Sequence, residues 1–193
     1  MRITMAPRCS ACSALSLRAT ANARKTLMAG FTTVRDVGGT DFIDVGLRNA
    51  INAGVVPGPR MLVAVHAPGS TGGHCDDSAG FRFGIFNRET GPEDGVINSP
   101  DQARYAVRFN IEYGAYLIKT RASGGVLSPT GDVDVPQLSQ EEPNALVDEA
   151  HTLRRKTAAH AHGAEAAKRA DDARQGRATL TTRIGRSRSR MRC

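Results

Sequence analysis

Two short apolar runs constrain this chain more than any other feature, because each ends in a potential metal ligand and then meets glycine. The first is Tyr116-Leu-Ile-Lys119, followed by a loop with glycines at 124–125. The second is Thr157-Ala-Ala-His160, followed by His162 and a glycine. Parallel α/β proteins place functional side chains at the carboxyl ends of strands, before a loop that leads to a helix. An amphipathic segment of helical length separates the two runs, so we expect consecutive strands of one βαβ unit.

The rest of the chain predicts further alternation of strands and helices. Residues 31–37 are rich in β-branched side chains, and residues 60–66 are almost continuously apolar, as in strands buried on both faces. Residues 67–98 and 121–138 are rich in glycine and polar residues, which predicts long loops. Apolar periodicity predicts helices over residues 15–28, 41–53, 99–113 and 139–155, and from 164 onward.

Several helix starts carry specific end signals. Asp41 and Ser99 are predicted N-caps, and Pro100 suits the first position of a helix. Ser139 and Glu142 have the spacing of a capping box. The resulting order of elements predicts an α/β fold with parallel strands and right-handed crossovers. Four such strands would form a small open sheet or half of an eight-stranded barrel.

The formal net charge of +7 is concentrated at the two ends of the chain. Residues 171–193 contribute +5 and residues 1–20 contribute +3, which leaves −1 for residues 21–170. The Arg-rich segment 171–193 has no apolar periodicity, so we expect a disordered tail. It also has no aromatic residue to stack on bases. A basic protein that binds nucleic acid through this tail is the alternative reading, although we expect no such partner.

The cysteines and apolar runs argue against a secreted or membrane protein. Four cysteines do not form a disulfide framework in 193 residues. Cys9 and Cys12 form an isolated C-x-x-C pair, and a small metal-binding module of these cysteines and the histidines is a further alternative. No run reaches the ~18 apolar residues of a membrane span, and no secretory signal is evident. We expect a soluble, cytoplasmic protein.

The polar residues at the two strand ends indicate metal chemistry. His160 and His162 are two positions apart on a strand, so they face the same side, and neutral imidazoles are common zinc ligands. Structural histidines would show the same spacing. Lys119 ends an apolar strand, where a charged ammonium is costly to desolvate. It must therefore form an ion pair, reach solvent or be chemically modified.

Phrases along residues 15–170 resemble the amidohydrolase superfamily, in its imidazolonepropionase-like and Xaa-Pro or Xaa-Arg dipeptidase branch. The matching phrases follow one another in the expected order. They are Leu27 to Gly39, Asn49 to Arg60, Thr71-Gly-Gly-His74, Ile118 to Gly125 and Ala158 to Gly163. The resemblance implies a (β/α)₈ barrel that hydrolyses a C–N amide or peptide bond of a small, dipeptide-like substrate with metal-activated water.

The resemblance also implies roles for particular residues. Lys119 would be a carboxylated lysine that binds one or two divalent metal ions, most simply zinc, and His160 would be a further ligand. His162 and His74 would contact the substrate. The catalytic aspartate of this family has no match here, so no residue of this chain is assigned as the catalytic base.

The chain also departs from the family pattern near both ends. The family's His-x-His precedes the first helix, but no histidine lies before Leu15, and Leu180 occupies the region of a further expected histidine. We therefore expect a partial barrel over residues 15–170, between an irregular segment 1–14 and the tail 171–193. The hypothesis is a truncated or frameshifted fragment, inactive alone and prone to self-association through unpaired strand edges.

Overall fold

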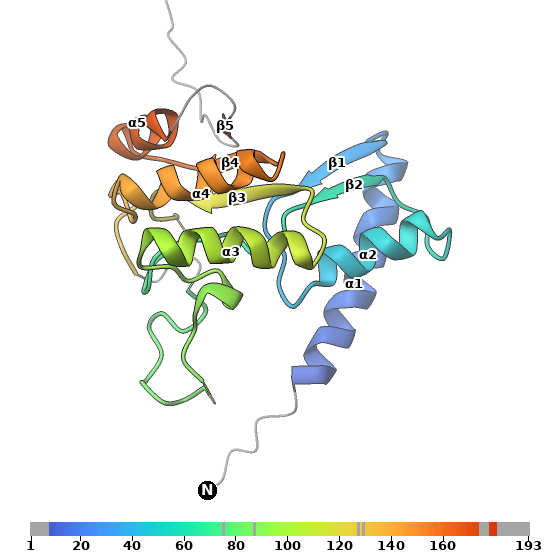
Figure 1. Ribbon diagram of the computed structural model, residues 1–193. Helices are drawn as coiled ribbons and strands as arrows, with labels where there is room; N and C mark the ends of the chain where they lie inside the picture. Colours follow the sequence, from blue (N-terminus) through green and yellow to red (C-terminus); the bar gives the residue numbers. More distant parts are fainter. Residues whose placement is uncertain are drawn as a thin grey trace, which may run out of the picture.

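The computed structural model describes residues 8–74, 76–86, 88–126, 128, 130–173 and 178–180, with residues 8–11 and 178–180 described by their backbone alone. Helices and strands alternate along it (Figure 1). The helices are α1 (Arg8–Met28), α2 (Ile43–Asn52), η1 (Pro92–Asp94), α3 (Pro100–Glu112), α4 (Glu141–Thr152) and α5 (Ala164–Asp172). The strands are β1 (Thr33–Asp36), β2 (Arg60–Val63), β3 (Leu117–Arg121), β4 (Lys156–His160) and β5 (Ala178–Leu180).

All strand pairs are parallel, as the sequence predicted. β1 pairs with β2, and β3, β4 and β5 form a second sheet in that order. Two backbone hydrogen bonds join the ends of β3 to β2 and the segment that follows it: the amide of Tyr116, just before β3, donates to the carbonyl of Val63, and the amide of Arg121 donates to the carbonyl of Pro68, both at 2.8 Å. The hydroxyl of Thr120 also donates to the carbonyl of Pro68, at 3.2 Å. The strands therefore follow one another in chain order, as expected of part of a barrel wall.

The two sheets separate at a kink in the chain just after β2. Val65 has a φ of 63°, a left-handed conformation that is rare for a β-branched residue. The buried carboxylate of Asp44 holds it there, accepting hydrogen bonds from the amides of Val65 at 3.0 Å and Val45 at 2.8 Å. The amide of Gly39 donates to the carbonyl of Val65 at 2.7 Å. This kink interrupts the ladder that a straight 60–66 strand would have continued.

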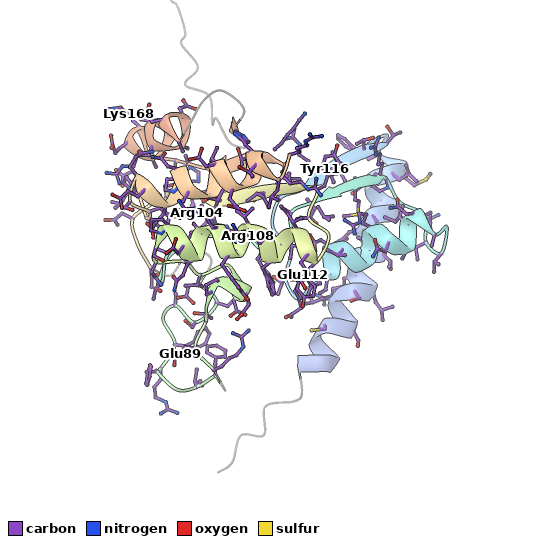
Figure 2. The ribbon with its side chains drawn as sticks, in the orientation of Figure 1. Glu89, Arg104, Arg108, Glu112, Tyr116 and Lys168 are labelled. Atoms are coloured by element: carbon purple, nitrogen blue, oxygen red, sulfur yellow. The ribbon has the colours of Figure 1, made fainter. Side chains whose placement is uncertain are left out.

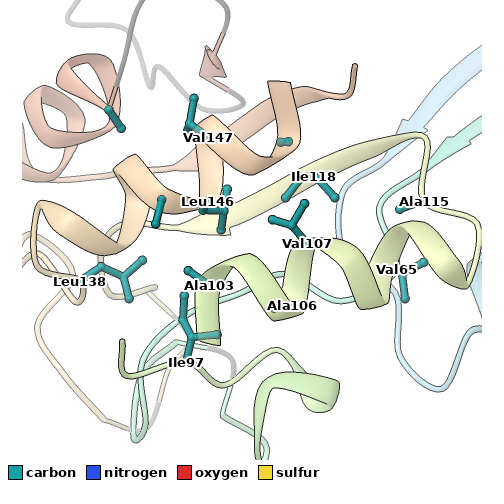
Figure 3. Close-up of a cluster of buried hydrophobic side chains, with 13 residues drawn as sticks. Val65, Ile97, Ala103, Ala106, Val107, Ala115, Ile118, Leu138, Leu146 and Val147 are labelled. Carbon is teal, nitrogen blue, oxygen red and sulfur yellow. The ribbon is translucent and has the colours of Figure 1, made fainter. Parts of the chain in front are cut away.

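Helices α3 and α4 pack side by side over β3 and enclose the main hydrophobic core (Figures 1 and 3). Val107 of α3, Ile118 of β3 and Leu146 of α4 are fully buried there. Each helix turns small or branched side chains inward, and charged residues such as Arg104 and Arg108 extend from the outer face of α3 (Figure 2). Burying one such Leu or Ile side chain contributes about 1.5–3 kcal/mol, so this core holds the strands' ends in place.

The end signals of α3 are confirmed, the predicted N-cap of α2 is wrong, and the capping box predicted for α4 is confirmed in part. The hydroxyl of Ser99 caps α3 by accepting from the amide of Gln102 at 3.2 Å. The N-cap of α2 is Phe42 in a left-handed conformation, because the carboxylate of Asp41 turns away and accepts from Sγ of Cys12 at 3.3 Å.

The predicted capping box of α4 is present only in part. The N-cap is Gln140, and no side chain caps the helix. The carboxylate of Glu142 still accepts a hydrogen bond from the amide of Ser139, at 2.8 Å, which is the reciprocal half of the motif. Pro143 is tolerated because it lies in the first turn, where its missing N–H is not needed.

The structure adds a fifth strand to the four that were predicted. β5 lies within the segment expected to be a basic tail, and Thr157, Ala158 and Ala159 of β4 pair with its three residues. A run of only three residues has too little apolar alternation to be found by pattern. Residues 174–177 and 181–193 of the predicted tail lie outside the described part of the chain. Among the described residues, no helix is long and apolar enough to cross a membrane.

Candidate active site

Parallel pairing of β3 with β4 brings the predicted site residues to one edge. The register aligns Lys119 with Ala158 and Arg121 with His160. Both strands therefore end together, and the loops that follow them start from the same edge. This is the edge at which α/β sheets and barrels build their sites.

Three histidines gather at this edge, although one of them is far away in sequence. The ring centroids of His74 and His160 are 4.6 Å apart, and those of His160 and His162 are also 4.6 Å apart. His160 ends β4, His162 follows it, and His74 comes from the long loop 67–98. The prediction placed these three residues in one site, and the structure brings them together.

His160 has the environment of a neutral imidazole, and one of its two ring nitrogens lacks a partner among the described residues. Its Nε2 atom is buried without a hydrogen-bond partner among the described residues. Burial, followed by the nearby His74, Lys119 and His162, lowers the pKa of His160 to about 4, against the opposing effect of a backbone hydrogen bond at Gly124. An unprotonated ring nitrogen in a buried position has a lone pair available to a metal ion.

Lys119 is the most buried cationic side chain of the site, with 5% of its surface exposed. Burial lowers the pKa of its ammonium to about 8. No carboxylate of the described residues forms an ion pair with it. The sequence left three possibilities for this lysine: an ion pair, contact with solvent or chemical modification. Within the described chain, Lys119 forms no ion pair and is not exposed to solvent.

The loops hold the other two histidines through polar contacts that the sequence did not reveal. Nδ1 of His74 is 2.5 Å from the hydroxyl of Ser128, and the backbone amide of His74 donates to Oε1 of Gln137 at 2.9 Å. The amide of His162 donates to the buried hydroxyl of Ser123 at 2.9 Å. The loop 121–138 therefore determines where both imidazoles lie.

Glycine is required where this loop passes the imidazole of His74. A Cβ atom built on Gly125 would overlap the ring of His74. The ring therefore occupies the space that any other residue would fill. The glycine pair noted after the strand has a steric reason that only the folded chain reveals.

Sequence reasoning missed Arg121, whose guanidinium also lies at this edge. Its Nη1 atom donates to the carbonyl of His74 at 3.3 Å, and burial lowers the pKa of Arg121 to about 10. The available signal was its position two residues after Lys119, because alternate residues of a strand share a face. The pKa of His74 is lowered by burial first and then by Arg121, Lys119 and His162.

The described residues supply only part of a metal site. No group of three or more His, Cys, Asp or Glu side chains among them is arranged to hold a metal ion. The two residues predicted as ligands, Lys119 and His160, fit the role by burial and by the unpartnered Nε2 atom. Cys12 faces Asp41, far along the chain from this edge, and the side chain of Cys9 lies outside the described residues.

Comparison with known proteins agrees with this arrangement. The structure is an α/β fold of helices and parallel strands, and the model of the amidohydrolase family matches residues 13–189. The chain belongs to the amidohydrolase family, as the sequence phrases indicated.

The relatives include peptide and amide hydrolases. The chain is 33% identical to ochratoxinase of Aspergillus niger over 150 residues, which cover 72% of this chain and 30% of that enzyme. A solved Xaa-Pro dipeptidase with bound methionine is 38% identical, with a TM-score of 0.80, and the match covers 90% of this chain and 41% of that one. The structure of A. niger ochratoxinase matches with a TM-score of 0.70 at 31% identity, over 82% and 38% of the two chains. This chain thus spans less than half the length of these relatives.

Proposed function

We propose that this chain carries part of the active site of a metal-dependent hydrolase that cleaves a C–N amide or peptide bond. The observation that carries the proposal is the buried, unpartnered Nε2 atom of His160 beside His74 and His162. The relatives support a small amide substrate, since one is named for Xaa-Pro dipeptides and another for ochratoxin.

Lys119 and His160 are the proposed metal ligands, with zinc as the proposed ion. The lowered pKa of Lys119 leaves more of its amine unprotonated near neutral pH than for an ordinary lysine. That neutral amine can add CO₂, forming an N–C bond and releasing a proton. The resulting carbamate exchanges a buried cation for an anion with two oxygen ligands. A bound zinc ion would polarise the scissile carbonyl and lower the pKa of a bound water molecule.

The remaining residues orient the substrate in this proposal. His162 and His74 present imidazoles to the substrate carbonyl, and Ser123, Ser128 and Gln137 fix their positions. Such fixed donors reduce the loss of freedom when a substrate binds. A catalytic base is not assigned among these residues, and we propose that the isolated chain does not turn over substrate.

Metal retention by the complete 193-residue chain tests this proposal. The chain would be loaded with zinc in bicarbonate buffer, passed through a desalting column and analysed for bound metal. We expect zinc to be retained, and His160→Ala to weaken retention by at least about tenfold, since even outer contacts to metal ligands have effects of this size.

His151→Ala is the matched control, because His151 also has a buried, unpartnered Nε2 atom but lies at the far end of α4. This variant should retain zinc like the unaltered chain. Equal loss in both variants, or no retention in the unaltered chain, would exclude the proposed metal site. Cleavage of an Xaa-Pro dipeptide by the isolated chain would contradict the proposed inactivity while supporting the hydrolase assignment.

A further inference from the structure

The guanidinium of Arg121 uses only one of its two hydrogen-bonding edges. Nη1 donates to the carbonyl of His74, and the backbone amide of Arg121 donates to the carbonyl of Pro68. Nε is buried and has no partner among the described residues, and Nη2 has none there either. These two atoms form the edge of the guanidinium that best matches the two oxygens of a carboxylate.

Two other arginines of the described chain use Nε as a hydrogen-bond donor. Nε of Arg155 donates to the carbonyl of Ala115 at 3.3 Å. Nε and Nη2 of Arg48 both donate to the side chain of Asn49, at 3.1 and 2.9 Å. Of Arg48, Arg121 and Arg155, only Arg121 therefore leaves both Nε and Nη2 unused.

The ends of β1 and β2 leave room for this side chain. A Cβ atom on Gly38 would lie 3.2 Å from Nη2 of Arg121, and one on Gly69 would lie 3.4 Å from its Cβ. Glycine at both positions lets the guanidinium lie over the ends of the neighbouring strands. Any larger side chain at position 38 would crowd Nη2, which belongs to the unused edge.

While Lys119 carries no carbamate, the site has an excess of positive charge that an anion would neutralise. Lys119 and Arg121 are two residues apart on β3, and burial is the sole resolved cause of the pKa shift of each. No carboxylate among the described residues forms an ion pair with either side chain. An unpaired buried charge is strongly unfavourable, so an anionic partner would relieve a real penalty.

We propose that the Nε–Nη2 edge of Arg121 binds a free carboxylate of the substrate and so selects substrates that carry one beside the scissile amide. Nη1, which is bound to the carbonyl of His74, fixes the plane of the guanidinium. The inference rests on the proposed amide hydrolysis for the identity of the substrate. The binding itself needs no metal, so the two proposals can fail independently.

The test is carboxylate binding by the complete chain in metal-free, bicarbonate-free buffer. N-acetyl-L-proline and its uncharged amide would be titrated separately while the histidine ring proton signals are followed by NMR. We expect the acid to bind at least about tenfold more tightly than the amide, as for a charge-assisted, two-point contact. Arg121→Gln should abolish this preference, and Arg121→Lys should reduce it, because an ammonium lacks the planar fork.

Two further variants keep the test decisive. Arg155→Gln removes an arginine from the opposite end of the sheet and should leave the preference unchanged. Gly38→Ala keeps the guanidinium but crowds Nη2, and it should lower acid binding more than amide binding. Equal affinity for acid and amide in the unaltered chain, or an unchanged preference in Arg121→Gln, would overturn the inference. Should Arg121→Gln fail to fold, an unchanged preference in Arg121→Lys would overturn it instead.

Discussion

The two ends of β3 and β4 carry similar residues in different surroundings. At the carboxyl ends, Lys119 is 5% exposed and Arg121 has an unused edge. At the amino end, Lys156 is exposed, and Nε of Arg155 is bound to a backbone carbonyl. A cavity of about 400 Å³ opens there, lined by His151, Arg154, Arg155 and Lys156.

The difference in burial between the two ends separates the positive charges that are costly to the fold from those that are not. Basic side chains at the amino end lie near water, so their charge has little effect on stability. Those at the carboxyl end are desolvated and form no ion pair with a carboxylate of the described residues, which destabilises the fold. This contrast between the two edges is the basis of our proposal that the carboxyl edge binds an anionic group of the substrate.

We expect the largest effect from a substitution that introduces a steric clash at the carboxyl ends of β3 and β4. A Cβ atom on Gly163 would overlap the backbone carbonyl of Asp134, and backbone cannot move aside as a flexible side chain can. We expect Gly163→Ala to lower the free energy of unfolding by about 3 kcal/mol, as for strong overpacking, measured by urea denaturation.

Gly46→Ala is the matched control for this steric prediction. Gly46 lies within α2, and a Cβ atom there meets nothing within 4 Å. Alanine should stabilise that helix by up to about 1 kcal/mol, because glycine is the poorer helix former. A neutral Gly163→Ala change would show that the loop before Gly163 is free to move and does not fix the edge.

An intermediate effect tests the buried charge directly. In metal-free, bicarbonate-free buffer at pH 7, Lys119→Met should raise the free energy of unfolding by on the order of 2 kcal/mol, since methionine needs no hydration. Lys156→Met, at the exposed end, should change it by less than about 0.5 kcal/mol.

The pH dependence of this gain follows from the pKa of Lys119. The value is about 8 in the folded chain against 10.5 for an ordinary lysine, so the folded state binds fewer protons between these values. The unfolding free energy of the unaltered chain should therefore rise with pH across that window, while that of Lys119→Met does not. Equal slopes for the two proteins would contradict burial of this ammonium.

The smallest effect concerns a carboxylate at the same edge. Asp36 ends β1, and burial, followed by repulsion from Asp44, raises its pKa. The folded state therefore holds the proton more tightly, so stability is highest at low pH and declines as pH rises through the raised pKa. Asp36→Asn should raise the midpoint of thermal unfolding at pH 7, with the gain disappearing toward low pH.

Asp101→Asn is the control for this carboxylate. Asp101 lies in the first turn of α3 with 95% of its side chain exposed, and it should show no comparable gain at pH 7. A loss of stability in Asp36→Asn would mean that the carboxylate has a favourable partner, and the comparison of the two edges would then need revision.

Much of the fold could be read from the sequence because the signals are local. The runs ending at Lys119 and His160 were confirmed as strands, and Ser99 was confirmed as a cap. The signals failed where a distant contact decided the outcome. Asp44 bends the chain at Val65 across 21 positions, and Cys12 draws the side chain of Asp41 away from α2. β5 depends on pairing with β4, and a run of three residues is too short to predict such pairing from the sequence.

The site divides in the same way. The residue types and spacing of Lys119, His160 and His162 were sufficient to predict metal chemistry at a strand end, because burial of such groups restricts what they can do. Only the tertiary structure placed the ring of His74 beside His160 and left Nε2 of His160 without a partner. It also left the Nε–Nη2 edge of Arg121 without a hydrogen-bond acceptor among the described residues. Those features depend on which atoms lie nearby in space. His74 and Arg121 are 47 positions apart in the sequence, and His74 and His160 are 86 positions apart, so their contacts are set by packing of the whole chain.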